Sequence, residues 1–463
     1  MEPITIRDIL TAVKGRILGD FDNLDLEISR VETDSRTIHP GSLFIPLIGE
    51  QFDGHAYITA ALEGGAAACF TQRDRESYLP GKCYIRVDHT QRALRELAVW
   101  YKKKFDIPVV AVTGSVGKTT TKDMVAAVLG EHYKVLKTEG NLNTDIGTCR
   151  TLFRLDRSYQ IAVLEMGMNH PGEIEVMSAI AQPDVCLITN IGDSHIEHLG
   201  SRENILKAKC EIFSHARPGC LAVLNGDDPL LRTLEGKLPG PILWCGGAPG
   251  LDYTADNLVS DGTSNVCCEI KTPHTSCQVE IPALGSHMIY PTLMAAAVAE
   301  HFGVTAEEFR RGVLHFAPTK MRMNIIQRGE DITILNDTYN ANPQSMRAAV
   351  EVLSKTHGER KIAVLGDMFE LGALAPALHA GIGTYLGKAG IDCLVAVGEL
   401  AKHIYDAAAE AGVPELHYCA TKQEALPVLA QVVKPHATIL VKASRGMAFE
   451  DLTEYLKQIT QEP

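Results

Sequence analysis

Residues 113–121, Thr-Gly-Ser-Val-Gly-Lys-Thr-Thr-Thr, combine glycines, a lysine and hydroxyl side chains in an order that suits phosphate binding. Glycines let the backbone curl so that its N–H groups face a phosphate, and the start of a helix adds positive potential. Lys118 supplies a point charge, and a threonine hydroxyl can hold magnesium. The common form of this loop has glycine at position 112, where this chain has valine, but the Gly-Lys-Thr core is intact. The segment therefore predicts a nucleoside triphosphate site.

Two further polar side chains come after apolar runs that are typical of buried strands. Glu165 follows residues 161–164, and His195 comes after the next run, residues 185–189. The carboxyl ends of parallel strands meet at one edge of a sheet, where such folds bind ligands. We therefore expect Glu165 to reach the phosphate loop as a magnesium ligand, and His195 to serve a second metal. The alternatives are that Glu165 is a solvated strand end and that His195 binds nothing.

The elements that would position these residues alternate between strand and helix patterns. Apolar strand runs occur at residues 109–112, 161–164, 185–189 and 221–224, and amphipathic helical segments at 173–180 and 202–213. A second series of strand runs occurs at residues 332–335, 362–365, 393–397 and 438–441. Such alternation predicts parallel sheets covered by helices.

Length and composition set the number of domains. The chain has 463 residues, of which 45% are hydrophobic and 22% charged, whereas a single hydrophobic core stops growing at roughly 250–300 residues. We predict an α/β chain of three domains. They are a small N-terminal α/β domain (residues 1–105), a central phosphate-loop domain with a mainly parallel sheet (106–315) and a C-terminal Rossmann-like domain (316–463).

Charge and cysteine usage exclude several classes of protein. With 44 basic and 57 acidic residues the net charge is −13, which disfavours a broad nucleic-acid-binding face. The first residues lack a signal peptide pattern, and no run of about 20 apolar residues predicts a membrane span. The 12 cysteines are scattered, which fits reduced thiols. We expect a cytoplasmic protein without membrane insertion, acting as a monomer.

Three motifs in the middle of the chain resemble the Mur ligase family. They are the phosphate loop, residues 164–169 (Leu-Glu-Met-Gly-Met-Asn) and residues 190–195 (Asn-Ile-Gly-Asp-Ser-His). The resemblance covers nearly the whole chain. Three more segments resemble the branch of the family that adds a dipeptide: residues 336–343 (Asn-Asp-Thr-Tyr-Asn-Ala-Asn-Pro), 365–372 (Leu-Gly-Asp-Met-Phe-Glu-Leu-Gly) and 442–446 (Lys-Ala-Ser-Arg-Gly).

The resemblance implies an ATP-dependent ligase that acts through an acyl phosphate, with ATP and Mg²⁺ as cofactors. Its substrates would be UDP-N-acetylmuramoyl-tripeptide and D-alanyl-D-alanine, in the last cytoplasmic peptide addition to the peptidoglycan precursor. ATP would bridge the central and C-terminal domains. Closure of these domains would then bring the two substrates together and exclude water.

The resemblance also implies site residues, position by position. The ATP contacts would be Thr113, Gly114, Ser115, Val116, Gly117, Lys118, Thr119, Thr120, Arg322 and Asp337. The UDP-sugar contacts would be Ser35, Arg36, Asp53, His55 and Asn141, and the dipeptide contacts Asn340, Asn342 and Arg445. Catalysis would rest on Lys118, Glu165, His195 and Lys209, and the metal ligands would be Thr119, Glu165, His195 and a carbamylated Lys209.

Some features depart from the family pattern or leave alternatives open. Met288 and Pro291 stand where the family commonly has asparagines that hold adenine, and Thr144 stands where the branch more often has asparagine. Lys209 has the alternative of an exposed helical lysine. Rival functions are a related ligase that adds a single amino acid, and a nucleotide-binding scaffold without catalysis. The third residue of the acceptor peptide and the general base are not fixed by the sequence.

Overall fold

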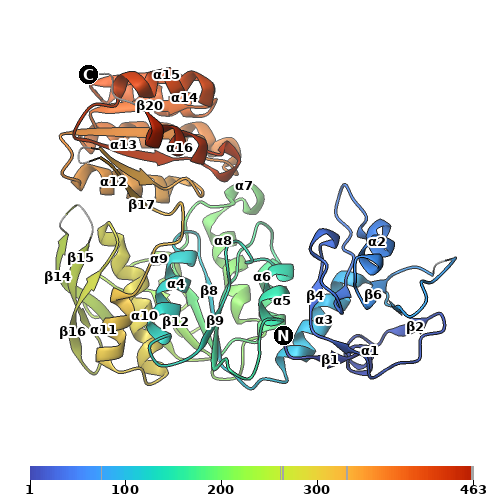
Figure 1. Cartoon of the computed structure of the whole chain (residues 1–463). Coiled ribbons are helices and arrows are strands. Elements are labelled where there is room, and N and C mark those ends of the chain that lie inside the picture. Colours follow the sequence, from blue (N-terminus) through green and yellow to red (C-terminus); the bar gives the residue numbers. More distant parts are fainter. Residues whose placement is uncertain (75, 261, 263–264, 330–331, 460–463) are drawn as a thin grey trace.

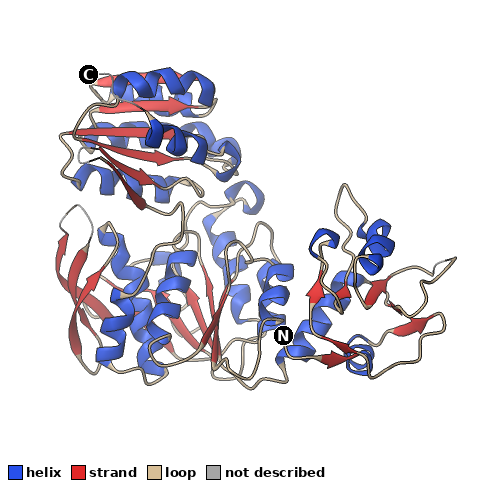
Figure 2. Ribbon diagram, viewed as in Figure 1, coloured by secondary structure: helices blue, strands red, loops and turns tan. Residues whose placement is uncertain are grey.

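A nine-stranded sheet forms the middle of the chain. Its elements are β8 (Val109–Thr113), α4 (Lys118–Leu129), β9 (Val135–Lys137), α5 (Asp145–Leu152), β10 (Ile161–Glu165), α6 (Glu173–Ala181), β11 (Val185–Ile188), α7 (Ile196–Leu199), α8 (Arg202–Lys209), β12 (Leu221–Asn225), α9 (Pro229–Arg232), β13 (Ile242–Gly246), β14 (Tyr253–Ser260), β15 (Val266–Lys271), β16 (Ser276–Ile281), α10 (Ile289–His301) and α11 (Ala306–Leu314). Along β8, Val109 and Ala111 belong to one hydrophobic cluster and Val110 and Val112 to another. Both faces of the parallel part of the sheet are therefore buried under helices (Figure 2).

The strand order explains why distant motifs meet. It is β16-β15-β14-β13-β12-β11-β8-β10-β9, and β8 pairs in parallel with both β10 and β11. The phosphate loop after β8 therefore lies between the segments that follow β10 and β11. A crevice at the carboxyl ends of such neighbouring strands is the usual ligand site of these folds.

The far edge of this sheet differs from the sequence-based prediction. β15 is antiparallel to both β14 and β16, and these strands were not predicted. In β15, Val266, Cys268 and Ile270 are buried while their neighbours are more exposed. Because only one face is buried, the strands lack the continuous apolar run that marks the parallel ones. Residues 202–213 also differ, since α8 ends at Lys209 and a 3₁₀ turn (Cys210–Phe213) follows.

The N-terminal part has its own five-stranded sheet of order β2-β7-β6-β5-β4. Its elements are β1 (Ile4–Thr5), α1 (Ile6–Val13), β2 (Arg16–Leu18), β3 (Glu27–Ile28), β4 (Val31–Glu32), β5 (Leu43–Phe44), α2 (Ile58–Glu63), β6 (Ala68–Thr71), β7 (Cys83–Arg86) and α3 (Thr90–Lys102), with 3₁₀ turns at Ser35–Thr37 and Gly54–Tyr57. A capping box in which Thr5 and Asp8 bond each other's backbone N–H starts α1. Helix α3 then leads the chain to β8.

The C-terminal part is a six-stranded sheet of order β17-β18-β22-β19-β20-β21, parallel except for β17. Its elements are β17 (Asn324–Arg328), β18 (Ile332–Asn336), α12 (Pro343–Lys355), β19 (Arg360–Gly366), α13 (Ala375–Lys388), β20 (Cys393–Val397), α14 (Ala401–Glu410), β21 (Glu415–Cys419), α15 (Lys422–Val432), β22 (Ala437–Lys442) and α16 (Glu450–Gln458), with 3₁₀ turns at Gly372–Leu374 and Arg445–Met447. The four predicted strand runs correspond to β18, β19, β20 and β22.

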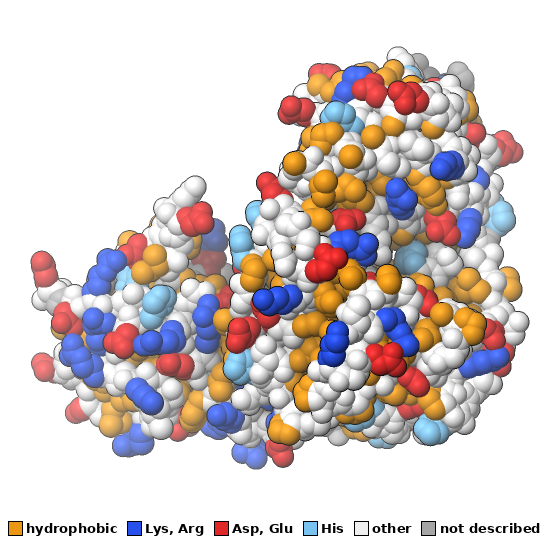
Figure 3. Space-filling view, turned by 180° about the vertical axis from the view of Figure 1, so that it is seen from behind, with side chains coloured by type: hydrophobic (Ala, Val, Ile, Leu, Met, Phe, Trp, Pro, Cys, Tyr) orange, Lys and Arg blue, Asp and Glu red, His pale blue; other side chains and the backbone are white. Residues whose placement is uncertain are grey.

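The computed structural model describes all residues except 75, 261, 263–264, 330–331 and 460–463, and it has three parts (Figure 1). The N-terminal part lies beside the central part, and the C-terminal part lies above it. From behind, a wide notch separates the two outer parts (Figure 3). The predicted three-domain α/β fold is confirmed, while its domain bounds stay predictions. In the described chain, no helix is long and apolar enough to cross a membrane.

The fully buried Tyr101 joins the N-terminal and central parts. Its hydroxyl donates to the Leu155 carbonyl (2.6 Å) and accepts from the Glu2 N–H (2.7 Å). We expect Tyr101→Phe to leave both groups unpaired and to lower the free energy of unfolding by about 1–3 kcal/mol. Thermal unfolding measures this loss. The matched control is Tyr418→Phe at an exposed ring; equal stability of the two variants would contradict the assignment.

Candidate active site

Two glycines give the phosphate loop its shape between β8 and α4. Gly114 has φ +148°, and a Cβ there would lie 1.9 Å from the Thr189 hydroxyl oxygen. Gly117 has φ +84° and is the N-cap of α4, with no side-chain cap bond. Both positions therefore require glycine, one for close approach and one for the left-handed turn. The uncapped N–H groups at the start of α4 are available to a phosphate.

The residues after β11 brace this loop. The Val116 N–H donates to Asn190 Oδ1 (2.9 Å), and Asn190 Nδ2 donates back to the Val116 carbonyl (3.0 Å). The Thr189 hydroxyl donates to the same carbonyl (2.5 Å), and Ser115 Oγ accepts from the Gly192 N–H (2.8 Å). Neither Asn190 nor Thr189 was among the predicted site residues. Their position directly after an apolar strand, beside the loop's own strand, was the available signal.

Glu165 is buried at the end of β10 with one oxygen bonded and one not. Oε1 accepts from the Thr119 hydroxyl (3.1 Å) and from Asn143 Nδ2 (2.9 Å). Oε2 is buried and has no hydrogen-bond partner among the described residues. An ionised carboxylate oxygen left in this state is costly unless a cation completes it. This orphan oxygen beside a loop hydroxyl fits magnesium, with Thr119 and Glu165 as protein ligands. Asn143, which holds Glu165, was not predicted.

The lysines of the site are electrostatically linked. Lys118 Nζ donates to the Gly114 carbonyl (2.8 Å). Burial lowers the pKa of Lys118, Glu165 raises it, and Arg322 lowers it further. Lys209 is 1% exposed, and burial together with the nearby Lys118 holds its pKa well below the usual range. Because the side chain is buried, the alternative of an exposed lysine is wrong. Lys209 makes no hydrogen bond or ion pair to a described residue.

His195 faces the C-terminal domain. It has φ +63° just before α7, and its Nδ1 lies 2.5 Å from Glu370 Oε2. Among the described contacts none joins His195 to Glu165 or Lys209, so its role as a metal ligand stays a prediction.

Of the predicted ATP contacts in the C-terminal half, Arg322 lowers the pKa of Lys118 through its charge, after the larger effect of burial. It lies in the segment between α11 and β17, and its guanidinium stacks on the Tyr339 ring at 4.2 Å. Its Nε is buried without a partner among the described residues. Asp337 instead accepts from Lys442 Nζ (2.5 Å). Tyr339 was missed because a cation–π contact leaves no spacing signal.

The predicted dipeptide residues are only partly together. The Arg445 N–H donates to Asn340 Oδ1 (3.4 Å), while its guanidinium pairs with Glu450 (2.9 Å). Asn342 instead caps α12 and donates to the Ser194 hydroxyl of the central domain (2.7 Å). Its local pattern, with proline next and serine three residues on, is that of a helix start.

The predicted UDP-sugar residues fall into two turns at one sheet edge and one distant loop. Ser35 and Arg36 follow β4, and Asp53 and His55 follow the neighbouring β5. Within the second turn, His55 Nδ1 contacts Asp53 (2.7 Å), and its Nε2 accepts from the Gln72 N–H (3.1 Å). His55 thus has both ring nitrogens bonded, whereas Asn141 is exposed in the central domain.

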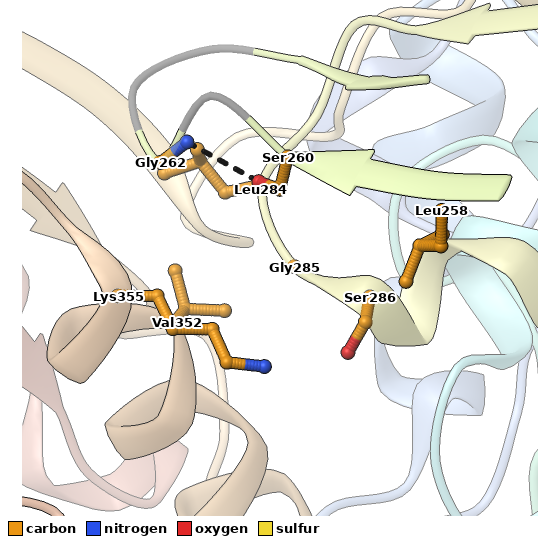
Figure 4. Close-up of a pocket in the computed structure, with 8 residues that line it drawn as sticks. All are labelled: Leu258, Ser260, Gly262, Leu284, Gly285, Ser286, Val352 and Lys355. Atoms are coloured by element: carbon orange, nitrogen blue, oxygen red, sulfur yellow. Dashed lines mark hydrogen bonds between the residues drawn. The ribbon is translucent and has the colours of Figure 1, made fainter. Parts of the chain in front are cut away.

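A cavity of about 260 Å³ lies between the central and C-terminal domains. It is next to residues 285–291, the segment that contains the positions where the family commonly holds adenine. Figure 4 shows Leu258, Ser260 and Ser286 of the central domain facing Val352 and Lys355 of α12. Met288 and Pro291 are buried in the packing around α10 and are not among the lining residues.

Three family models match the chain in order. They are the Mur ligase family, catalytic domain at residues 27–102, the Mur ligase middle domain at 112–299 and the Mur ligase, glutamate ligase domain at 321–445. A protein of Bacillus subtilis (strain 168) is 37% identical over 98% of each chain. The chain belongs to the Mur ligase family, as its motifs predicted.

The names of these relatives are more specific than the family. The Bacillus subtilis protein is named UDP-N-acetylmuramoyl-tripeptide--D-alanyl-D-alanine ligase. The crystal structure of MurF from Acinetobacter baumannii matches with a TM-score of 0.91, 33% identity and 99% coverage of both chains. MurF from Thermotoga maritima, solved in complex with ADP, matches with a TM-score of 0.83 at 28% identity, covering 93% of this chain and 97% of that one.

The orphan oxygen of Glu165 leads to a prediction about magnesium. Glu165→Gln keeps the shape but removes the charge, so we expect turnover to fall by about 10²-fold or more. The magnesium concentration for half-maximal turnover should rise with it. A magnesium titration of ATP turnover measures both effects, with Glu235→Gln at an exposed position as the matched control. An unchanged magnesium requirement would remove Glu165 from the metal site.

Proposed function

We propose that this chain is an ATP-dependent ligase that joins D-alanyl-D-alanine to UDP-N-acetylmuramoyl-tripeptide. The observation that carries this proposal is the phosphate loop beside the unpartnered oxygen of Glu165, in a chain whose relatives of that name match it from end to end. Because the substrates are nucleotides, we place the reaction in the cytoplasm. The chain would act as a monomer, releasing ADP and phosphate.

The chemistry proceeds in two steps. In the first, a tripeptide carboxylate oxygen bonds to the γ-phosphorus of ATP while the bond to the bridging oxygen of ADP breaks, giving an acyl phosphate. Lys118 and Arg322 offset the charge on the phosphoryl oxygens; Thr119 and Glu165 would hold magnesium, which would supply further charge neutralisation. In the second step, the neutral dipeptide amine bonds to the acyl carbon, loses its proton, and phosphate leaves.

The C-terminal domain would bind the dipeptide by its carboxylate. Arg445 offers a planar fork suited to a carboxylate, and its guanidinium is half-exposed, with Glu450 as its present partner. Asn340 is exposed beside it. Asn342 would contribute less to dipeptide binding than Arg445 and Asn340, because its side chain already caps α12 and contacts Ser194.

Phosphate release from ATP tests the proposed function directly. Purified protein with UDP-N-acetylmuramoyl-tripeptide should release phosphate when D-alanyl-D-alanine is added, and release about 10²-fold less with single amino acids, which cannot fill a dipeptide site. Release with a single amino acid alone would favour a related ligase. The absence of any acceptor-dependent release would favour a nucleotide-binding scaffold.

Lys209 carries a separate prediction. Carbamylation requires the neutral amine, and burial, which lowers the pKa of this lysine, favours that form. The resulting carbamate would supply the anionic oxygens that magnesium prefers. Removing dissolved carbon dioxide should therefore lower turnover by about tenfold, and bicarbonate should restore it.

The controls for this prediction are two conservative variants. Lys209→Arg should be nearly inactive and insensitive to bicarbonate, because a guanidinium does not form the carbamate. Lys207→Arg changes an exposed lysine on the same helix and should respond as the unmodified protein does. Turnover that ignores carbon dioxide in the unmodified protein would contradict carbamylation.

A further inference from the structure

Glu370 connects the C-terminal domain to the central domain at the start of α7. It lies in the loop between β19 and the 3₁₀ turn at Gly372–Leu374. Its Oε2 is 2.5 Å from His195 Nδ1, and its carbonyl accepts from the Glu197 N–H (3.3 Å). One residue of the C-terminal domain therefore contacts both His195 and Glu197 at the start of α7.

The backbone on both sides of this contact is unusual. Glu370 has φ +62° and His195 has φ +63°, although neither is glycine. Left-handed backbone at such residues costs of the order of 1–3 kcal/mol and persists where the surrounding structure holds it, often at functional sites. The pairing of two such residues across a domain boundary indicates that their meeting has a function beyond packing.

Histidines of the central domain lower the pKa of the Glu370 carboxyl. The hydrogen bond from His195 is the largest cause of its lowered pKa, and His198 and His170 contribute through their charge. The rings of His170 and His198 lie 4.9 Å apart in the central domain. The Glu370 carboxylate of the C-terminal domain thus contacts His195 and lies in the electrostatic field of two further histidines of the central domain.

We propose that Glu370 is a positioning residue that couples docking of the C-terminal domain to the orientation of His195. Glu370 Oε2 accepts a hydrogen bond from the Nδ1–H of His195. The other ring nitrogen of His195, Nε2, would then bind the metal. This proposal rests on the proposed function and on the predicted role of His195 as a ligand of a second metal. Metal-binding histidines commonly donate their other N–H to a carboxylate, which fixes the ring and strengthens the ligand.

The coupling has a consequence for the order of events. When the C-terminal domain is undocked, His195 loses the group that fixes its ring, and the metal site is weaker. The site therefore reaches full strength when the domain that carries the dipeptide is in place. Assembly of this kind favours transfer to the intended acceptor over wasteful hydrolysis.

Binding of Mn²⁺ in the presence of a β,γ-methylene analogue of ATP tests the proposal without turnover. Electron paramagnetic resonance should show a Kd for Mn²⁺ about 10–100-fold higher in Glu370→Ala, with Glu370→Gln intermediate. Glu410→Ala, an exposed glutamate on α14 of the same domain, is the matched control and should bind Mn²⁺ as the unmodified protein does. Equal Mn²⁺ affinity of Glu370→Ala and the unmodified protein overturns the proposal.

A double-mutant cycle separates positioning from general structural support. If Glu370 acts through His195, adding Glu370→Ala to His195→Ala should weaken Mn²⁺ binding less than twofold further. A full additional loss in that background overturns the proposal. The proposed function is judged apart, by dipeptide-dependent phosphate release from the unmodified protein. If the unmodified protein shows no dipeptide-dependent phosphate release but Glu370→Ala still weakens Mn²⁺ binding, the proposed reaction is rejected and the role of Glu370 stands.

Discussion

The buried carboxylate of Glu165 is the constraint on which the centre of the structure depends. Taking a charge out of water costs several kcal/mol unless partners compensate it, and the described residues compensate only one of its oxygens. The sheet order places this group at the phosphate loop, because β10 and β8 are neighbours. Asn143 and Thr119 then fix one oxygen, so that the other is presented to a cation.

The three domains divide the proposed work in a way that follows from their contacts. The central domain holds the phosphate loop, Glu165 and Lys209 on rigid elements that two layers of helices cover. The C-terminal domain contacts the central domain through Asn342 and Glu370, and the charge of Arg322 lowers the pKa of Lys118. Apolar residues of the two domains also belong to one hydrophobic cluster.

The sequence was sufficient to predict those features of the fold and site that produce a pattern among neighbouring residues. Glycine spacing marked the phosphate loop, and continuous apolar runs marked the parallel strands, so Glu165 was located at a strand end. It was not sufficient for β15, because a strand with one exposed face lacks that run. Asn190, Asn143, Tyr339 and Glu370 depend on strand order and domain docking, which bring together residues far apart in the chain. No spacing rule contains that information.

Arg322 has a further significance because of where it sits. The chain passes from the central sheet to the C-terminal sheet once, between α11 and β17, and Arg322 lies in that connecting segment. The connection is a short tether, so Arg322 would stay near the central sheet if the rest of the C-terminal domain moved away. The proposed contact of Arg322 with ATP would then persist in an open state, whereas contacts made by the predicted dipeptide residues would not.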